Sequence, residues 1–342
     1  MKKILFAVLR GAGVTRLAAW WHRDRTVFLC YHSVTKWPRP SRDELNLHVP
    51  LAVFVKHLDY LQSHCRVVSL GDYLAARESG RRLPDYAAVL TFDDGMRNFL
   101  TVVAPLMKER GLAATVFVIT EKASERDNTR FDSEWTPLDS RRHLSWPEIR
   151  ALAAAPGITI GSHSHTHPDL TALAEEEARA ELRDSLAAIR KHTGEARPAL
   201  AYPHGRAGVR VRELAEALGY SCALTGELGA NDMRSDLFDL RRVVIAGDDD
   251  IATFAARVSG LTWWYDRARS FFRKLKSLAA ADGARGPRAA KPSAHEGARF
   301  VQTKNPSPEP IPYLARSSSE SPCAAARTSS PPAASLSAKS SP

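Results

Sequence analysis

The sequence predicts an α/β domain built from parallel β/α units, with a basic amphipathic helix before it and a disordered tail after it. Apolar segments alternate with segments of helical periodicity from about residue 26 to about residue 270. Polar side chains follow several of the apolar segments directly, as they do at the carboxyl ends of strands in α/β barrels. Residues 271–342 hold ten of the 21 prolines among Ser and Ala repeats, a composition that buries too little apolar surface to fold.

The elements follow from the local pattern. The predicted strands are VFLCYHSV (27–34), RVVSL (66–70), AAVLTF (87–92), ATVFVI (114–119), ITIGSHSH (158–165), PALAYPHG (198–205) and SCALT (221–225). The predicted helices occupy 54–64, 71–80, 99–110, 146–154, 174–192 and 211–218. In the first of these helices, for example, Phe54, Leu58 and Leu61 recur at helical spacing. We therefore predict one domain over 26–270.

The net charge of +10 is concentrated at the two ends of the chain. Residues 1–26 carry six Lys/Arg against one Asp, and residues 271–342 carry eleven Lys/Arg against four Asp/Glu. The remainder, residues 27–270, has a net charge of −2. A nucleic-acid-binding domain would carry its basic residues on the folded part. The charge pattern therefore excludes nucleic acid as a partner.

Residues 1–25 form a segment of their own. The apolar run from Ile4 to Leu9 is only six residues long, which is short for an export signal. Leu and Trp residues alternate with Arg, which suits a basic amphipathic helix on an anionic membrane surface. A helix packed on the domain and a poor export signal are the alternatives. Because the segment lacks a convincing export signal, we expect a cytoplasmic protein or one peripheral to the inner membrane, with export as the alternative. No apolar run of about 18 residues exists, which excludes a multispan membrane protein.

Two motifs carry the chemistry. In TFDDG, Asp93 and Asp94 end an apolar strand, and two adjacent carboxylates repel each other unless a cation lies near them. A solvated turn is the plain alternative. In GSHSHTHPDL, His163, His165 and His167 follow the next strand but one. His163 and His167 converge if the run turns helically, whereas all three share a face if it is extended, so the spacing leaves the metal ligands open.

Two further histidines are weaker candidates. His204 lies in AYPHG, where a Pro-x-Gly break after a strand places backbone N–H groups that suit an oxyanion hole. His32 ends the first strand beside Tyr31, in a position where a histidine is more often structural than catalytic. Trp135 and Trp146 are candidates for a sugar-stacking rim, or else belong to an ordinary loop and the core.

These motifs, in this order, resemble the polysaccharide deacetylases of the NodB-homology group (carbohydrate esterase family 4). TFDDG, HSHTH and AYPHG carry the resemblance, together with YHSV, ATVFV, LSWPEI and LRRVVI. The opening Tyr-His strand is closest to the poly-N-acetylglucosamine deacetylase branch. The resemblance covers about Phe28 to Ile245. It implies a distorted (β/α) barrel and removal of N-acetyl groups from N-acetylhexosamine units of a bacterial polysaccharide or its lipid-linked precursor.

The resemblance also implies roles for single residues. A divalent metal, most often zinc with cobalt or nickel as alternatives, would be held by Asp94, His163 and His167. Asp93 would be the general base, and a backbone N–H near His204 would stabilise the oxyanion.

The sequence departs from the family pattern in two places. The family's third motif has an Arg that pairs with the base, and here Ala201 stands at about that position. The family also has a late histidine that acts as general acid, and after Ile245 this chain has only His295, in the predicted tail. We predict His32 as the proton donor, with His165 and His204 as alternatives. A metal-stabilised scaffold or glycan-binding protein, and a hydrolase of small amides, are the alternative functions.

Overall fold

The computed structural model of the chain describes residues 2–36, 46–124 and 142–265. Its strands are β1 (Val27–Tyr31), β2 (Ser33–Thr35), β3 (His48–Pro50), β4 (Arg66–Val67), β5 (Ala87–Phe92), β6 (Ala114–Val118), β7 (Ile158–Ser162), β8 (Leu200–Ala201), β9 (Ala223–Leu228) and β10 (Leu240–Val244). Its helices are α1 (Lys2–Gly11), α2 (Val14–Trp21), α3 (Leu51–His64), α4 (Leu70–Glu78), the π-helical η1 (Phe99–Val103), α5 (Ala104–Arg110), α6 (Thr120–Ser124), α7 (Trp146–Ala153), α8 (Glu175–Thr193), the 3-10 turn η3 (Pro203–Gly205), α9 (Val209–Leu218) and α10 (Ile251–Val258).

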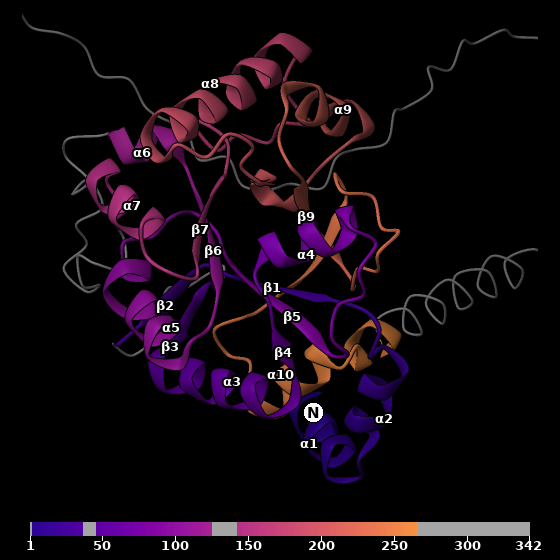
Figure 1. The fold of residues 1–342 in the computed structure, drawn as a ribbon. Coiled ribbons are helices and arrows are strands. Elements are labelled where there is room, and N and C mark those ends of the chain that lie inside the picture. Colours follow the sequence, from indigo (N-terminus) through magenta and orange to yellow (C-terminus); the bar gives the residue numbers. More distant parts are fainter. Residues whose placement is uncertain (1, 37–45, 125–141, 266–342) are drawn as a thin grey trace, which may run out of the picture. The chain divides into compact units, whose positions relative to one another are not determined.

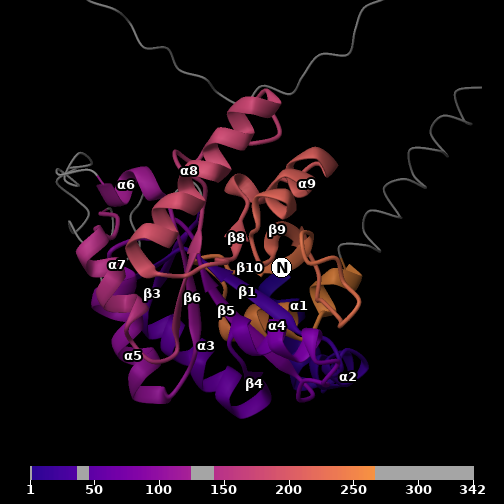
Figure 2. The ribbon, with the colours of Figure 1, turned by 45° about the horizontal axis from the view of Figure 1, so that its top comes forward.

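Seven parallel strands close into a barrel, with helices around the outside (Figures 1 and 2). The order runs β1-β10-β9-β8-β7-β6-β5, and β5 pairs with β1 along its length to close the ring. The short β4 pairs only with the first residues of β5, whereas β6 pairs with its last residues. The predicted α/β barrel is therefore confirmed.

Several predicted elements differ in length from the observed ones. The strand predicted over 27–34 is interrupted at His32, and its second half pairs with β3 in a separate small sheet. The strand predicted over 158–165 ends at Ser162, and those over 66–70 and 198–205 shrink to two residues each. Polar residues and proline at their ends leave the ladder to form loops. We predicted no elements for β10 and α10, although β10 closes the barrel.

Alternate residues of the barrel strands point to opposite sides, which creates two apolar layers. The interior is filled by a cluster that includes Phe28, Val89, Phe117, Leu224 and Leu240. The intervening residues, such as Leu29 and Leu90, join the larger cluster beneath the surrounding helices. Gly161 leaves room for the filling, since a Cβ there would lie 2.4 Å from the Phe117 ring.

A polar layer lies above this apolar filling, at the carboxyl ends of the strands. Cys30 is two residues beyond Phe28, Thr91 and Asp93 follow Val89 at the same two-residue period, and Arg242 is two residues beyond Leu240. These side chains therefore share the inward direction of the residues below them. All four are buried. The strand period thus places a carboxylate, a guanidinium and a thiol together at one mouth of the barrel.

The N-terminal segment packs on the outside of the barrel, against α10 and near the first residues of β1 and β5. We predicted one helix over residues 1–25, and the structure has two, bent by 81°. Phe6 of α1 is buried against Ala252 and Ala256 of α10. A cavity of about 220 Å³ is lined by α2 and by the first residues of β1 and β5. Among the described residues, no single helix has the length and apolarity to cross a membrane, although α1 and α2 pass that test as a bent pair.

Candidate active site

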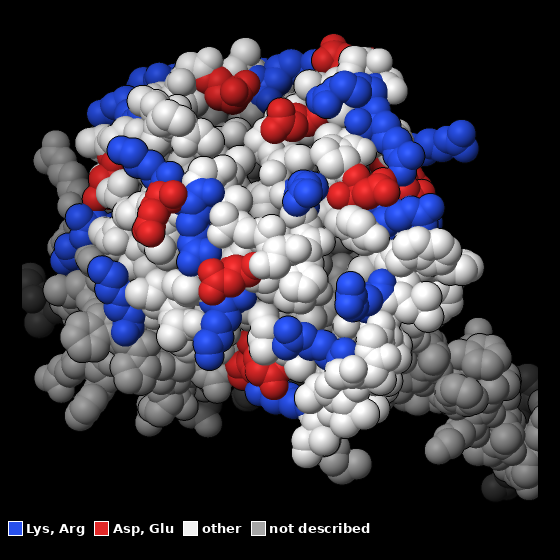
Figure 3. All heavy atoms as spheres, turned by 60° about the horizontal axis from the view of Figure 1, so that its bottom comes forward, with Lys and Arg blue, Asp and Glu red and all other residues white. Residues whose placement is uncertain are grey.

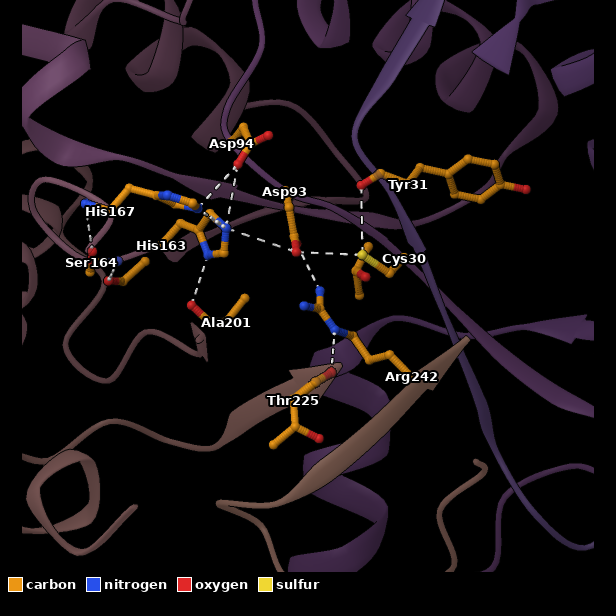
Figure 4. Close-up of polar contacts among 12 residues, drawn as sticks. Cys30, Tyr31, Asp93, Asp94, His163, Ser164, His167, Ala201, Thr225 and Arg242 are labelled. Atoms are coloured by element: carbon orange, nitrogen blue, oxygen red, sulfur yellow. Dashed lines mark hydrogen bonds and ion pairs between the residues drawn. The ribbon is translucent and has the colours of Figure 1, made fainter. Parts of the chain in front are cut away.

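A strained turn after β5 separates Asp93 from Asp94. Asp94 has a positive φ of 67° and is followed by Gly95 with a φ of 63°. His143 supports the turn because its Nδ1–H donates to the carbonyl of Asp94 over 2.8 Å, and the N–H of Leu144 donates to the carbonyl of Gly95. The left-handed conformation costs free energy for a residue other than glycine. It sends the two neighbouring carboxylates in different directions (Figure 4).

The loop after β7 turns sharply and brings two of its three histidines together. Ser164 and His167 have positive φ angles of 63° and 68°, and the N–H of His167 donates to Ser164 Oγ. The Nε2 atoms of His163 and His167 lie 3.2 Å apart. His165 faces elsewhere and hydrogen-bonds with Thr120 Oγ1 over 2.9 Å. The loop is therefore turned rather than extended, and His165 is not part of the cluster.

Asp94, His163 and His167 form a triangle of ligand atoms. Asp94 Oδ1 lies 3.4 Å from His163 Nε2 and 3.6 Å from His167 Nε2, and the two nitrogens are 3.2 Å apart. A tetrahedral zinc ion with bonds of about 2.0–2.1 Å to N and O requires ligand atoms about 3.3–3.4 Å apart. The triangle therefore fits a divalent ion of this kind and leaves a fourth position open.

Hydrogen bonds and neighbouring charges keep the ligand atoms of the triangle in states that bind a cation. The carbonyl of Ala201 accepts from Nδ1–H of His163 over 2.8 Å, which leaves the Nε2 lone pair facing the triangle. Burial alone would raise the pKa of Asp94, but His163, His32 and His167 outweigh it and hold that pKa well below its usual range. Burial and the neighbouring His163 lower the pKa of His167 to about 4. The carboxylate is thus ionised and His167 neutral, the states in which both bind metal.

Asp93 occupies a different environment, beneath the triangle. Its Oδ1 accepts from Arg242 Nη1 over 2.7 Å, and both side chains are almost fully buried. Its Oδ2 lies 4.0 Å from His163 Nε2 and accepts from the Cys30 thiol over 3.4 Å. Burial would raise the pKa of Asp93, but Arg242 and His163 outweigh it and lower the pKa to about 2. One oxygen is therefore fixed by the guanidinium, and the other faces the triangle.

Arg242 is the main residue of the site that the sequence analysis missed. Its Nε donates to the carbonyl of Thr225 on β9 while Nη1 holds Asp93, so it joins two strands to the carboxylate (Figure 4). We expected no such partner because Ala201 stands where the family pattern has an arginine. The available signal was a charged residue inside the apolar run LRRVVI, because an arginine there must be paired if it is buried.

The structure places the remaining candidates at different distances from the site. An imidazole nitrogen of His32 lies within 4.8 Å of Cys30 Sγ and of an Asp93 carboxylate oxygen. His32 Nδ1 is buried and has no hydrogen-bond partner among the described residues. His204 is exposed, has a φ of 56°, and its ring centroid lies 4.7 Å from that of His167.

Trp146 does not contribute to a sugar-stacking rim. It is buried, stacks on His192 at 4.1 Å and donates its indole N–H to Ser124 Oγ. Its alternative interpretation, a core residue, is therefore correct. Trp135 lies outside the described residues.

Residues 80–223 match the sequence profile of the family described as "Polysaccharide deacetylase". The chain contains a polysaccharide deacetylase domain. The matched range includes the Asp94 triangle, Asp93 and His204, whereas His32 and Arg242 lie outside it. Two polar residues of the site therefore come from outside the matched range. His32 lies directly after β1 and Arg242 lies on β10, and these two strands pair with each other.

Curated relatives and solved structures agree with the domain's fold. The chain is 23% identical over 234 residues to YxkH of Bacillus subtilis (strain 168), provisionally named a polysaccharide deacetylase, covering 68% of this chain and 76% of YxkH. It is 24% identical over 270 residues to the poly-beta-1,6-N-acetyl-D-glucosamine N-deacetylase of Escherichia coli (strain K12), covering 70% of this chain but only 39% of that protein. IcaB from Ammonifex degensii superposes with a TM-score of 0.55 at 23% identity, covering 69% of this chain and 97% of IcaB.

Proposed function

We propose that this chain removes N-acetyl groups from N-acetylhexosamine units of a bacterial polysaccharide or its lipid-linked precursor, and that it does so with a divalent metal ion. The observation that carries the proposal is the ligand triangle of Asp94, His163 and His167 with a second, separately held carboxylate facing it. The deacetylase domain and the name of the Escherichia coli relative support the substrate class. Poly-N-acetylglucosamine is the substrate we favour.

Asp94, His163 and His167 would hold the metal, and zinc fits the set best, with cobalt or nickel as alternatives. When bound, such an ion supplies Lewis acidity, which lowers the pKa of water and polarises the acetamide carbonyl. The residues around it fix the geometry. Ala201 sets the tautomer of His163, and the turn at Asp94 aims one carboxylate oxygen at both imidazoles.

Asp93 would accept the proton of the attacking water through Oδ2. Arg242 occupies Oδ1, so only Oδ2 is available on the side of the triangle. The pKa of about 2 keeps the carboxylate ionised at neutral pH and makes it a weak base. A general base is most effective when its pKa lies near the working pH, so Asp93 would contribute through its position more than through its basicity. The fixed position of Asp93 suits this task.

His32 is the proton donor that we propose for the leaving amine. It lies near Asp93, and its buried Nδ1 makes no hydrogen bond within the described residues, so no other side chain there holds its proton. His32→Ala should lower kcat by about 10²- to 10⁴-fold, the usual contribution of a general acid, with bound zinc unchanged. Steady-state kinetics and metal analysis check this. His204→Ala is the control, and a larger loss there would transfer the donor role to His204.

The backbone N–H of His204 is our candidate for stabilising the oxyanion. The N–H of Gly205 already donates to the carbonyl of Tyr202, and the ring centroid of His204 lies 4.7 Å from that of His167, which places His204 next to the ligand triangle. The scaffold alternative rested partly on the missing arginine of the third motif. Arg242 supplies a guanidinium to Asp93 from β10, which removes that support.

Acetate release from N-acetylglucosamine oligomers tests the proposal. Purified protein is treated with a chelator, assayed, and assayed again after one equivalent of zinc or cobalt is restored. We expect release to stop and then to return, with one ion bound per chain. His163→Ala and His167→Ala should bind no ion at this site and release no acetate.

The same experiment separates the alternatives. One bound ion without acetate release from any oligomer would support a scaffold or a glycan-binding protein. Release from small amides alone would support the amide hydrolase. A chain that binds no ion would contradict the site itself. We propose that the protein lies in the cytoplasm or is peripheral to the inner membrane.

A further inference from the structure

The outward side of α1 and α2 is an apolar surface, which we call the outer face. It consists of Ile4, Leu5, Val8, Leu17, Trp20 and Trp21, with Trp264 as a neighbour of His22 at the end of α2. Ile4 is 70% exposed and Trp21 is 66% exposed. These seven residues make up most of the exposed large apolar side chains in the described part of the chain. Such a concentration marks an interaction surface rather than ordinary scatter.

The outer face is not the side of α1 and α2 that packs against the domain. The inward side of the same segment already packs on the domain, because Phe6 is buried against α10 and contacts the ring of Tyr265 edge-on. Thr15 of α2 is also buried. The two helices are therefore held on the domain by one side while they present apolar residues on the other.

Basic residues lie on the same two helices and directly after α2. Arg10, Arg16 and Arg25 are exposed, although Arg16 and Arg25 also line the cavity between α2 and the barrel strands. Arg23 lies over the Trp20 ring at 4.8 Å and pairs with Asp85 over 3.7 Å. Lys3 is bound to Asp248, which offsets part of the charge. Figure 3 shows that Lys and Arg side chains on this side of the molecule lie among uncharged ones and beside several Asp and Glu side chains. Residues 1–26 have a net charge of +5, whereas 27–270 have −2. The charge of the outer face therefore complements an anionic partner.

The sequence that follows the described residues is also basic. The described residues end at Tyr265, whose ring contacts Phe6 of α1. The next eleven residues, DRARSFFRKLK, carry five Lys/Arg against one Asp. A second copy of the chain would bring the same positive charge to the same face, so self-association there is opposed by repulsion. Anionic lipid headgroups have the opposite charge, and tryptophan favours the boundary between headgroups and acyl chains.

We propose that the outer face binds peripherally to a lipid bilayer that contains anionic headgroups. The apolar side chains of α1 and α2 enter the headgroup region, and the arginines around them contact lipid phosphates. The 81° bend between the helices opposes a span and suits two helices that lie on the surface. α2 lies near the amino ends of β1 and β5, whereas the site is at the carboxyl ends of the strands.

Vesicle sedimentation of the full chain tests the proposal without any assay of acetate release. The vesicles contain phosphatidylcholine alone or phosphatidylcholine mixed with phosphatidylglycerol. We expect at least about tenfold stronger binding to the anionic vesicles, because each basic residue near such a surface adds attraction, and weaker binding as salt rises. The double variant Trp20→Ser/Trp21→Ser should lose about tenfold or more of the binding. Val209→Ser, which changes an exposed apolar residue on α9, is the matched control and should bind as the wild type does.

Several results would overturn the proposal. Equal binding of the double variant and the wild type would assign the attraction to other basic segments. Equal binding to neutral and anionic vesicles would remove the role of charge. Light scattering that shows a dimer, lost in the double variant, would identify a second copy as the occupant. Because the readout is binding, these results stand apart from success or failure of the deacetylase assay.

Discussion

Asp93→Asn is expected to abolish acetate release while the protein keeps its metal ion. The asparagine retains the shape of the side chain, and its Oδ1 still accepts from Arg242. It cannot take a proton from water, so the reaction loses its base. We expect kcat to fall by about 10³-fold or more, since a general base usually contributes about 10²- to 10⁴-fold. Single-turnover acetate release and metal analysis of the same sample check both parts.

Asp94→Asn is the matched control for that experiment. It changes the neighbouring carboxylate in the same way but removes a charged ligand, so the ion and the activity should be lost together. Activity that survives in Asp93→Asn would mean that another group takes the proton. Metal loss in Asp93→Asn would mean that the two carboxylates share one role.

Arg242→Met is expected to destabilise the protein by about 3–5 kcal/mol at neutral pH, because it leaves the buried carboxylate of Asp93 without its partner. In the wild type the pKa of Asp93, about 2, lies below its ordinary value, so its stabilisation is present at neutral pH and declines as pH falls toward 2. Without Arg242, burial raises the pKa of Asp93 above its ordinary value. The stability difference between variant and wild type should therefore shrink as pH falls. Urea unfolding at a series of pH values measures it.

The activity of the Arg242 variants separates a positioning role from a structural one. With its pKa raised, Asp93 takes up a proton at higher pH, so the acidic limb of the rate profile should move to higher pH in Arg242→Met. Arg242→Lys keeps a positive charge and should restore part of both stability and activity. The double variant Asp93→Asn/Arg242→Met should regain stability but not activity. An Arg242→Met protein as stable as the wild type would contradict the buried pair.

The residue types of the site were easier to predict from the sequence than the strand that closes the barrel. TFDDG and the histidine run directly follow apolar segments, and the local pattern placed both at the carboxyl ends of parallel strands, whereas the barrel was implied by the family resemblance. The sequence could not decide between a turned and an extended run at His163–His167. That depends on left-handed residues at Ser164 and His167, neither of which is glycine. Local propensity favours right-handed or extended backbone there, so only the surrounding contacts fix the turn.

Arg242 and the strand that carries it required knowledge of the complete fold. Arginine is rarely buried, and a strand with two arginines has the pattern of a solvent-exposed edge. The pairing of Leu29 with Val243 instead places β10 inside the ring, next to β1. The two segments are more than 200 residues apart in the chain, so no local pattern could have revealed that they meet.

β10 is the last barrel strand to be synthesised on the ribosome, and this affects how the nascent chain folds. When residues up to 225 have emerged, the chain already holds all three histidines of the loop and both aspartates, but β1 still has one unpaired edge. Asp93 lacks its guanidinium partner at that stage, because Arg242 emerges after every other polar residue of the site. A nascent chain is therefore exposed to pairing with other strands until its last strand is inserted. Completion of the barrel and completion of the site are a single event.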